Sequence, residues 1–206
     1  MLAVTLFAAT TAYASESADV IKQRTGSGNP GAGESKSKLC QGCHGEHGFS
    51  LEDVIPHLAG QYAIYIEKQL RNFKSGTRKN QIMSTMAMTI NDADLDDIAA
   101  YFASQEKMKG GGWGYNPAAK KLFLKGDSTR NIRPCASCHG VNGEGKAPNI
   151  AAFPVIGGQH KAYLRTQLIH WRSGERSNSP GGVMNKIAKS LTDAEIEALT
   201  DYISGL

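Results

Sequence analysis

The sequence lacks any apolar run long enough to cross a bilayer. Residues 2–14 form an apolar stretch near the start, but it is shorter than the roughly 20 residues that a membrane-spanning helix needs, so no transmembrane span is expected. Runs of Lys or Arg and clusters of aromatic side chains are also missing, which argues against binding to nucleic acid. No segment shows the alternation that is typical of strands, so the chain is expected to be all-α.

The apolar stretch ends in Ala12-Tyr13-Ala14, a small-residue pattern that is typical of signal-peptide cleavage sites. We therefore expect residues 1–14 to be a signal peptide and the protein to be exported to the periplasm. The basic residues that usually precede such a stretch are missing, because the first Lys or Arg is Lys22. Residues 15–30 are rich in Ser, Gly and charge and are expected to form a flexible N-terminal lead.

Cysteine is scarce: the chain has four, and all of them lie in two pentapeptides of the form CxxCH. Two thiols at this spacing can form thioethers to the two vinyl groups of one porphyrin, and the next histidine can bind the iron. The motif is therefore the attachment signature of a c-type haem. The sequence predicts two covalently bound haem c groups, held by Cys40, Cys43 and His44 and by Cys135, Cys138 and His139.

Two other uses of paired cysteines agree less well with the sequence. A zinc site built from four cysteines would give no reason for the histidine that follows each pair. A thioredoxin-like motif needs a βαβ setting that the sequence does not show. Because haem is attached to CxxCH outside the bacterial cytoplasm, export fits the haem interpretation. We interpret the chain as a dihaem cytochrome.

The second half of the chain repeats the first, which indicates two copies of one haem unit. The two motifs are 95 residues apart, and farther on the offset becomes 98. It then becomes 101 before the last helix of each copy, and both changes fall in segments rich in Gly, Pro or Ser, where loops tolerate insertion. The pairs at offset 98 include Gln61/Gln159, Tyr65/Tyr163, Gln69/Gln167 and Arg78/Arg176.

The segment between the copies is rich in glycine and contains Trp113, a composition that is typical of a linker. We expect a first cytochrome c domain over residues 31–106, a linker over 107–116 and a second cytochrome c domain over 117–206. Trp113 is expected to anchor the linker against one domain.

Each copy is expected to contain a helix that ends at the CxxCH motif and a second over about 61–74 or 159–172. A third follows the potential caps Asn91 and Thr192, each with an acidic residue three positions later, as in a capping box. Its apolar face, at helical spacing, consists of Leu95, Ile98, Ala99 and Phe102 or of Ile196, Leu199 and Ile203.

A haem held by one histidine needs a second axial ligand or an open face. Methionine suits electron transfer because it raises the reduction potential. Met184 is the only methionine after the second CxxCH motif, and it lies in the expected loop before the last helix. The matching loop of the first copy offers Met83, Met86 and Met88. Extending the offset of 101 back through this loop places Met83 opposite Met184, which favours Met83 as the ligand.

Pro56 and Pro154 lie 12 and 15 residues after the motif histidines. Either their carbonyl groups accept the second ring N–H of the iron-binding histidine, or the prolines only stiffen the loops. The other histidines each occur in one copy only, so we interpret them as surface or hydrogen-bonding groups. They are His47, His57, His160 and His170.

The order of these motifs resembles the cytochrome c4 family over about residues 31–206. Each copy has CxxCHG, then (L/I)-(A/G)-G-Q, then Q-L and (F/W)-(K/R)-S-G, then a methionine and a final helix. That family consists of periplasmic dihaem cytochromes with two tandem class I cytochrome c domains. The resemblance implies porphyrin attachment through the four cysteines and the axial pairs His44/Met83 and His139/Met184. It also implies electron transfer to terminal oxidases or from periplasmic dehydrogenases.

The predicted function is electron transfer between redox proteins, from a respiratory chain or a dehydrogenase to a terminal oxidase, and the chain is not expected to be an enzyme. The alternatives are a dihaem enzyme, such as a peroxidase or a thiosulfate-oxidising cytochrome, and the cytochrome subunit of a dehydrogenase. A peroxidase needs a vacant or displaceable ligand position, and a Cys-ligated catalytic haem needs a fifth cysteine. The sequence is also compatible with peripheral association with a membrane.

Charge is distributed unevenly along the chain. Residues 1–105 carry 9 Lys/Arg and 11 Asp/Glu, a net of −2, whereas residues 106–206 carry 14 and 8, a net of +6. Such asymmetry favours orientation of a charged protein partner. The alternative is two ordinary solvated surfaces.

Overall fold

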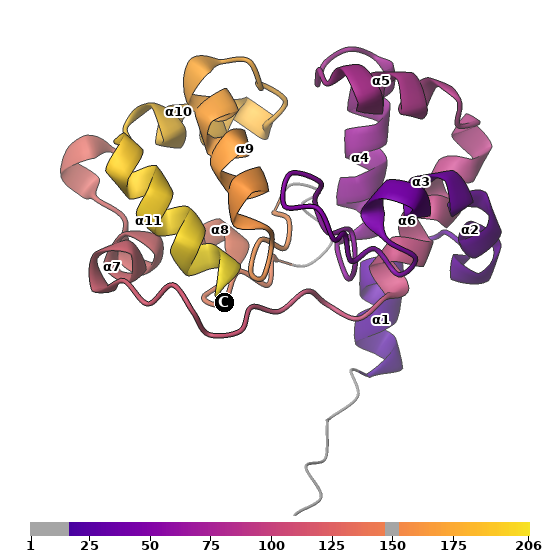
Figure 1. The fold of residues 1–206 in the computed structure, drawn as a ribbon, viewed down its shortest axis with the longest axis horizontal. Coiled ribbons are helices and arrows are strands. Elements are labelled where there is room, and N and C mark those ends of the chain that lie inside the picture. The colour runs from indigo at the N-terminus through magenta and orange to yellow at the C-terminus, as the bar shows by residue number, and fades with distance from the viewer. Residues whose placement is uncertain (1–16, 147–152) are drawn as a thin grey trace, which may run out of the picture.

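The computed structural model describes residues 17–146 and 153–206. These residues form two helical lobes joined by an extended segment (Figure 1). The only extended pairing among them is an isolated bridge between Asp127 and Ile132, so the expected all-α class is confirmed. Within these ranges no helix has the length and apolar character needed to cross a membrane. The expected signal peptide, residues 1–14, lies outside the described residues.

The first lobe is built around α6, which packs against α1, α2 and α4, while α5 packs on α4. α3 carries the first CxxCH motif. Glycine allows the close crossing of α2 and α6, because a Cβ atom on Gly33 would lie 1.9 Å from the carbonyl oxygen of Asp97. The helices of this lobe are α1 (Ala18–Thr25), α2 (Pro30–Lys36), α3 (Lys38–His44), α4 (Ala63–Lys74), α5 (Gln81–Met88), the 3₁₀ turn η1 (Asp92–Asp94) and α6 (Leu95–Ser104).

The second lobe repeats this arrangement, with α11 packed against α7 and α9, and α10 packed on α9. α8 carries the second CxxCH motif. In both lobes the expected apolar face of the last helix is buried, as Leu95 and Ile196 show with 0% and 1% exposure. The elements are α7 (Pro117–Lys125), η2 (Ser128–Arg130), α8 (Cys135–His139), α9 (Lys161–Ser173), η3 (Pro180–Gly182), α10 (Val183–Lys189) and α11 (Asp193–Ser204).

The expectation of a flexible lead over residues 15–30 is wrong for part of that segment, because residues 18–25 form α1. This helix packs on α6. The reason is Arg24, which is 3% exposed and donates to the carbonyl oxygens of Ala103 and Gln105 at 2.5 and 3.2 Å. These carbonyls belong to the C-terminal end of α6, where backbone acceptors have no partner within the helix. The polar composition of residues 18–25 therefore does not show that Arg24 fixes this segment against α6.

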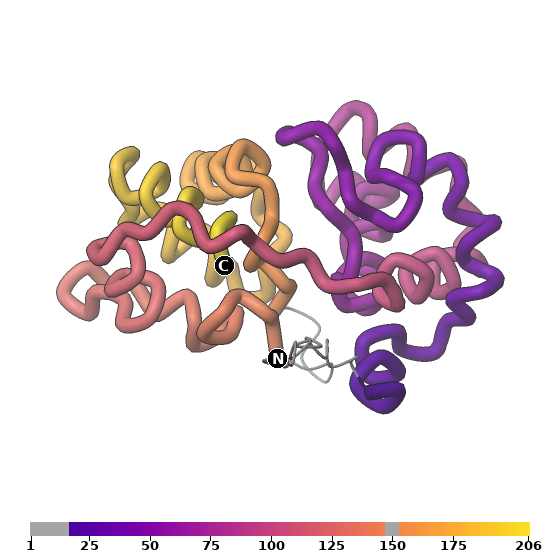
Figure 2. Tube along the Cα trace, turned by 60° about the horizontal axis from the view of Figure 1, so that its bottom comes forward, coloured from indigo at the N-terminus to yellow at the C-terminus, as the bar shows by residue number. Residues whose placement is uncertain are grey.

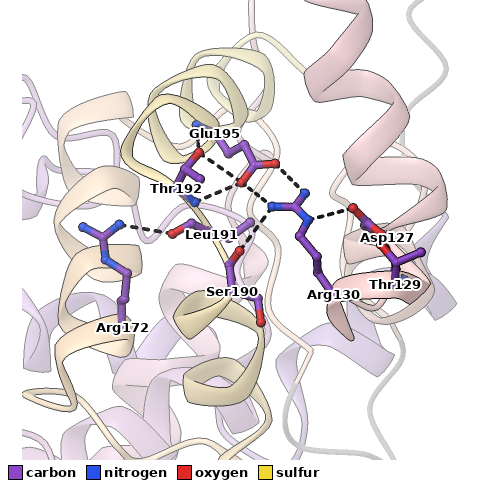
Figure 3. A network of polar contacts seen from close by, with 8 residues as sticks. All are labelled: Asp127, Thr129, Arg130, Arg172, Ser190, Leu191, Thr192 and Glu195. Carbon is purple, nitrogen blue, oxygen red and sulfur yellow. Dashed lines mark hydrogen bonds and ion pairs between the residues drawn. The ribbon is translucent and has the colours of Figure 1, made fainter.

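The capping box expected at Thr192 is present, and the one expected at Asn91 is not. Thr192 and Glu195 exchange hydrogen bonds at the start of α11, and Glu195 also receives the guanidinium of Arg130 at 2.6 Å (Figure 3). In the first copy Asp94 instead pairs with Lys36 at 2.7 Å. The chain there forms the 3₁₀ turn η1 before α6 begins, without a side-chain cap on Asn91.

The segment that joins the lobes runs along one side of the second lobe (Figure 2). The Trp113 ring N–H donates to the hydroxyl of Ser204 at 3.4 Å, and the N–H of Gly112 donates to the carbonyl of Gly205 at 3.0 Å. Trp113 therefore anchors the linker against the second lobe, as expected from the sequence.

Candidate haem-binding sites

The first motif histidine is buried at the C-terminal end of α3. His44 is 7% exposed, and its Nδ1–H donates to the carbonyl oxygen of Pro56 at 2.9 Å. Burial lowers the pKa of His44, while the bond to Pro56 opposes this shift. The ring is thus held neutral with its Nδ1 used, which leaves Nε2 to bind a metal.

The second motif repeats this geometry at the end of α8. His139 is 8% exposed and donates from Nδ1 to the carbonyl oxygen of Pro154 at 2.9 Å. Burial lowers its pKa as well, against the opposing effect of the bond to Pro154. The hydrogen bonds considered for the two prolines are therefore both present, and they fix the tautomer and orientation of each ring.

The four cysteines, two in each lobe, form no disulfide. Cys40 and Cys135 are partly buried and pack against the hydrophobic core of their lobes. Burial raises the pKa of both, to about 11 for Cys135, whereas Cys43 is exposed. In the described ranges no three metal-binding side chains gather at one place, so the four-cysteine zinc site has no support there. Two thiols that are partly buried or exposed, beside a buried neutral imidazole, are a donor set that fits covalent haem.

The two favoured methionines lie on short helices, not in loops as expected. Met83 is in the first turn of α5, where its N–H donates to the Asn80 side chain at 2.9 Å, and it packs against the core of the first lobe. Met184 is in the first turn of α10, and its N–H donates to the Ser179 hydroxyl at 3.2 Å. Met88 is 72% exposed.

The boundary between the lobes contains two arginines in equivalent positions. Arg78 donates to the hydroxyl of Tyr163 at 3.0 Å, and Arg176 donates to the hydroxyl of Tyr65 at 3.1 Å. Each also donates to a glutamine of its own lobe. The arginines are 8% and 6% exposed, and neither is paired with a carboxylate in the described part of the chain. Exchanging the two copies maps one set of contacts onto the other.

Glutamines form a second pair of contacts across the boundary. The side chain of Gln61 bonds to the backbone of Val155, and that of Gln159 bonds to the backbone of His57. The offset of 98 residues matches these glutamines and arginines between the copies, but their spacing alone predicts no role for them. Their identity in both copies is itself a sequence signal. A polar residue that is the same in two copies of a helical unit indicates a contact and not a solvated surface.

A comparison with protein families matches the cytochrome c model to residues 31–106 and 118–206. The two matches and the two donor sets define the class as dihaem c-type cytochromes. Cytochrome c4 of Thiocapsa roseopersicina is 39% identical over 184 residues, which cover 87% of this chain and 93% of that protein. The crystal structure of reduced recombinant cytochrome c4 from Pseudomonas stutzeri aligns with a TM-score of 0.80 at 39% identity, covering 87% of this chain and 99% of that one.

The chain belongs to the cytochrome c4 family. It is accordingly a dihaem electron-transfer cytochrome that binds two haem c groups covalently. A further relative, the thiosulfate dehydrogenase electron acceptor of Stutzerimonas stutzeri (strain A1501), is 36% identical, and the match covers 88% of this chain and 82% of that protein.

Proposed function

We propose that the first haem is attached through Cys40 and Cys43, with His44 and Met83 as its axial ligands. The second is attached through Cys135 and Cys138, with His139 and Met184. The observation that carries this assignment is the buried neutral histidine at the end of each motif helix, with Nδ1 bonded to a proline carbonyl and Nε2 left for iron. The two domains extend over residues 31–106 and 117–206, with 107–116 as the linker.

When bound, each haem supplies one-electron redox chemistry. The chain sets the potential at which the electron is exchanged. His44 and His139, which donate through Nδ1, would be more basic ligands, and the thioethers of Met83 and Met184 would favour the ferrous state. The short helices α5 and α10 present their methionines from a first turn in which a preceding side chain binds the backbone N–H. This hydrogen bond fixes the backbone position from which each thioether side chain extends.

The carrier accepts electrons from a periplasmic dehydrogenase or respiratory donor and delivers them to a terminal oxidase, without transforming a substrate of its own. The relative named as the electron acceptor of thiosulfate dehydrogenase supports a dehydrogenase as donor. The apolar stretch with its Ala-x-Ala end supports a location in the periplasm.

Replacement of Met83 tests the ligand assignment. Met83→Ala should remove half of the methionine–iron charge-transfer absorbance of the oxidised protein and lower one of the two potentials, because one haem loses its thioether. Met184→Ala should remove the other half. Met86→Ala and Met88→Ala are the matched controls and should leave both haems six-coordinate. Loss of the absorbance in Met86→Ala alone would show that the alignment of the two copies is out of register.

A further inference from the structure

Each motif histidine is connected to the opposite lobe through a single peptide group. In the first lobe the Pro56 carbonyl accepts from His44 at 2.9 Å. The N–H of the same peptide group belongs to His57, and it donates to Oε1 of Gln159, in the other lobe, at 2.9 Å. The carbonyl oxygen of the Pro56–His57 peptide group thus binds His44, while its N–H binds Gln159 of the other lobe.

The second lobe shows the same chain of contacts in reverse. The Pro154 carbonyl accepts from His139 at 2.9 Å, and the N–H of that peptide group, on Val155, donates to Oε1 of Gln61 at 2.9 Å. Gln61 belongs to the first lobe. The two chains of hydrogen bonds run in opposite directions across one boundary.

Each glutamine also binds the next peptide group along the chain. Gln159 Nε2 donates to the carbonyl oxygen of His57 at 3.0 Å, and Gln61 Nε2 donates to that of Val155 at 2.8 Å. Both glutamines are 4% exposed. A buried side-chain amide that lost these partners could not replace them with water. The docking of the lobes therefore fixes the hydrogen bonds of both glutamines.

Hydrogen bonds in series polarise one another. When Gln159 accepts from the peptide N–H, the carbonyl oxygen of Pro56 becomes a stronger acceptor. A stronger acceptor on Nδ1 makes His44 a more basic ligand, and a more basic ligand stabilises the ferric state. The glutamine therefore lowers the potential of an iron in the lobe that it does not belong to.

We propose that Gln159 is a positioning residue for the first haem and Gln61 for the second, so that each lobe sets the reduction potential of the haem in the other. This inference rests on the assignment of His44 and His139 as iron ligands made above. It predicts crossed effects: a change in the second lobe alters the first haem, and a change in the first lobe alters the second.

The test uses the full-length, haem-loaded protein and a redox titration followed by NMR of the haem methyl groups, which reports the two haems separately. In Gln159→Ala the first haem should become easier to reduce by about threefold in its equilibrium constant, or about 30 mV at 59 mV per tenfold change, and the second should not move. In Gln61→Ala the second haem should become easier to reduce by a similar amount, and the first should not move. In the reduced protein the Nδ1 proton resonance of the affected histidine should shift as its hydrogen bond weakens.

Two further sets of variants distinguish the positioning role of the glutamines from a general weakening of the contact between the lobes. Gln159→Met and Gln61→Met keep the side-chain volume and remove the same hydrogen bonds, so they should reproduce the crossed pattern even where the alanine variants fold poorly. Asn178→Ala removes bonds to Gln69 and Asn72 across the boundary, of 2.9 and 2.7 Å, without touching either peptide. It should give no selective shift.

The proposal is overturned if each glutamine variant alters the haem of its own lobe, if neither potential moves, or if Asn178→Ala gives the same selective shift. A failure of the ligand assignment looks different. In that case the unaltered protein itself would lack the spectrum of two histidine–methionine haems.

Discussion

The rings of His57 and His160 meet across the boundary between the two lobes, with their centroids 3.9 Å apart and their planes tilted by 38°. Burial, with a smaller contribution from the charge of His160, lowers the pKa of His57 to about 4. The Asp53 carboxylate lies 3.5 Å from His160 Nδ1, and the edge of Phe49 meets the His57 ring. His57 Nδ1 is buried and has no partner among the described residues.

This arrangement predicts acid sensitivity of the folded protein. Below its ordinary pKa of 6.5, His57 takes up a proton in the unfolded chain but not in the folded one, so the free energy of unfolding should fall from pH 6.5 to about 4 and level off below. His57→Val, which introduces the residue at the equivalent position of the second copy, should flatten this slope. Denaturant titrations of the haem-loaded protein at several pH values measure it. The exposed His47 offers the control His47→Val, and an equal flattening there would contradict the prediction.

Arg176 should contribute more to stability than an exposed arginine. Arg176→Met leaves the hydroxyl of Tyr65 and the amide oxygen of Asn178 without their buried donor, which should cost about 2–4 kcal/mol in the free energy of unfolding. Arg165→Met is the matched control, because Arg165 is half exposed and pairs only with Glu197 among the described residues. That change should cost less than about 1 kcal/mol. Equal losses in the two variants would show that the buried network adds nothing.

Haem attachment should be required for folding of each lobe. The double change Cys40→Ser and Cys43→Ser prevents attachment in the first lobe, and the pair Cys135→Ser and Cys138→Ser does so in the second. Because a cofactor that binds only the native state contributes directly to stability, each variant should lose a large part of its far-ultraviolet helical signal. Protein without either haem should be largely unfolded. A native-like circular dichroism spectrum of the haem-free chain would contradict this expectation.

Salt should slow electron exchange with anionic reagents. Lys120, Lys121 and Lys125 on α7 are exposed and have no ion-pair partner in the described part of the chain, within the half that carries a net charge of +6. Long-range attraction should raise the rate with hexacyanoferrate at low ionic strength and fade as the Debye length shortens. Replacing the three lysines by alanine should reduce both the rate and its salt dependence in stopped-flow measurements. A rate that is the same at low and high salt would rule out this attraction.

Motifs with a fixed local spacing could be predicted from the sequence. The spacing of CxxCH follows from covalent attachment to one porphyrin, and that of the capping box of Thr192 and Glu195 follows from hydrogen bonds within one helical turn. The helices α5 and α10 were not expected, since they have only 8 and 7 residues and contain polar or glycine-flanked positions that suggest loops. Their formation depends on packing against α4 and α9, which a local pattern does not contain.

The contacts between the lobes could be anticipated only in part. The offset of 98 identified Gln61 with Gln159 and Arg78 with Arg176 as equivalent. However, equivalence does not say whether a side chain faces its own core or the other copy. At Asn91 the pattern predicted a capping box that does not form. The N–H of Asp94 donates to the Asn91 carbonyl oxygen, and the Asp94 carboxylate pairs with Lys36, which is 58 residues away in the sequence.

The equivalent contacts of Arg78 with Tyr163 and of Arg176 with Tyr65 make the boundary isologous, as in a twofold-symmetric homodimer. One copy of the repeat carries both the donor and the acceptor of every such contact, so it is complementary to itself. The linker joins the two copies, so they meet within the chain at an effective concentration on the order of millimolar. Their pairing therefore does not depend on how much protein the cell makes.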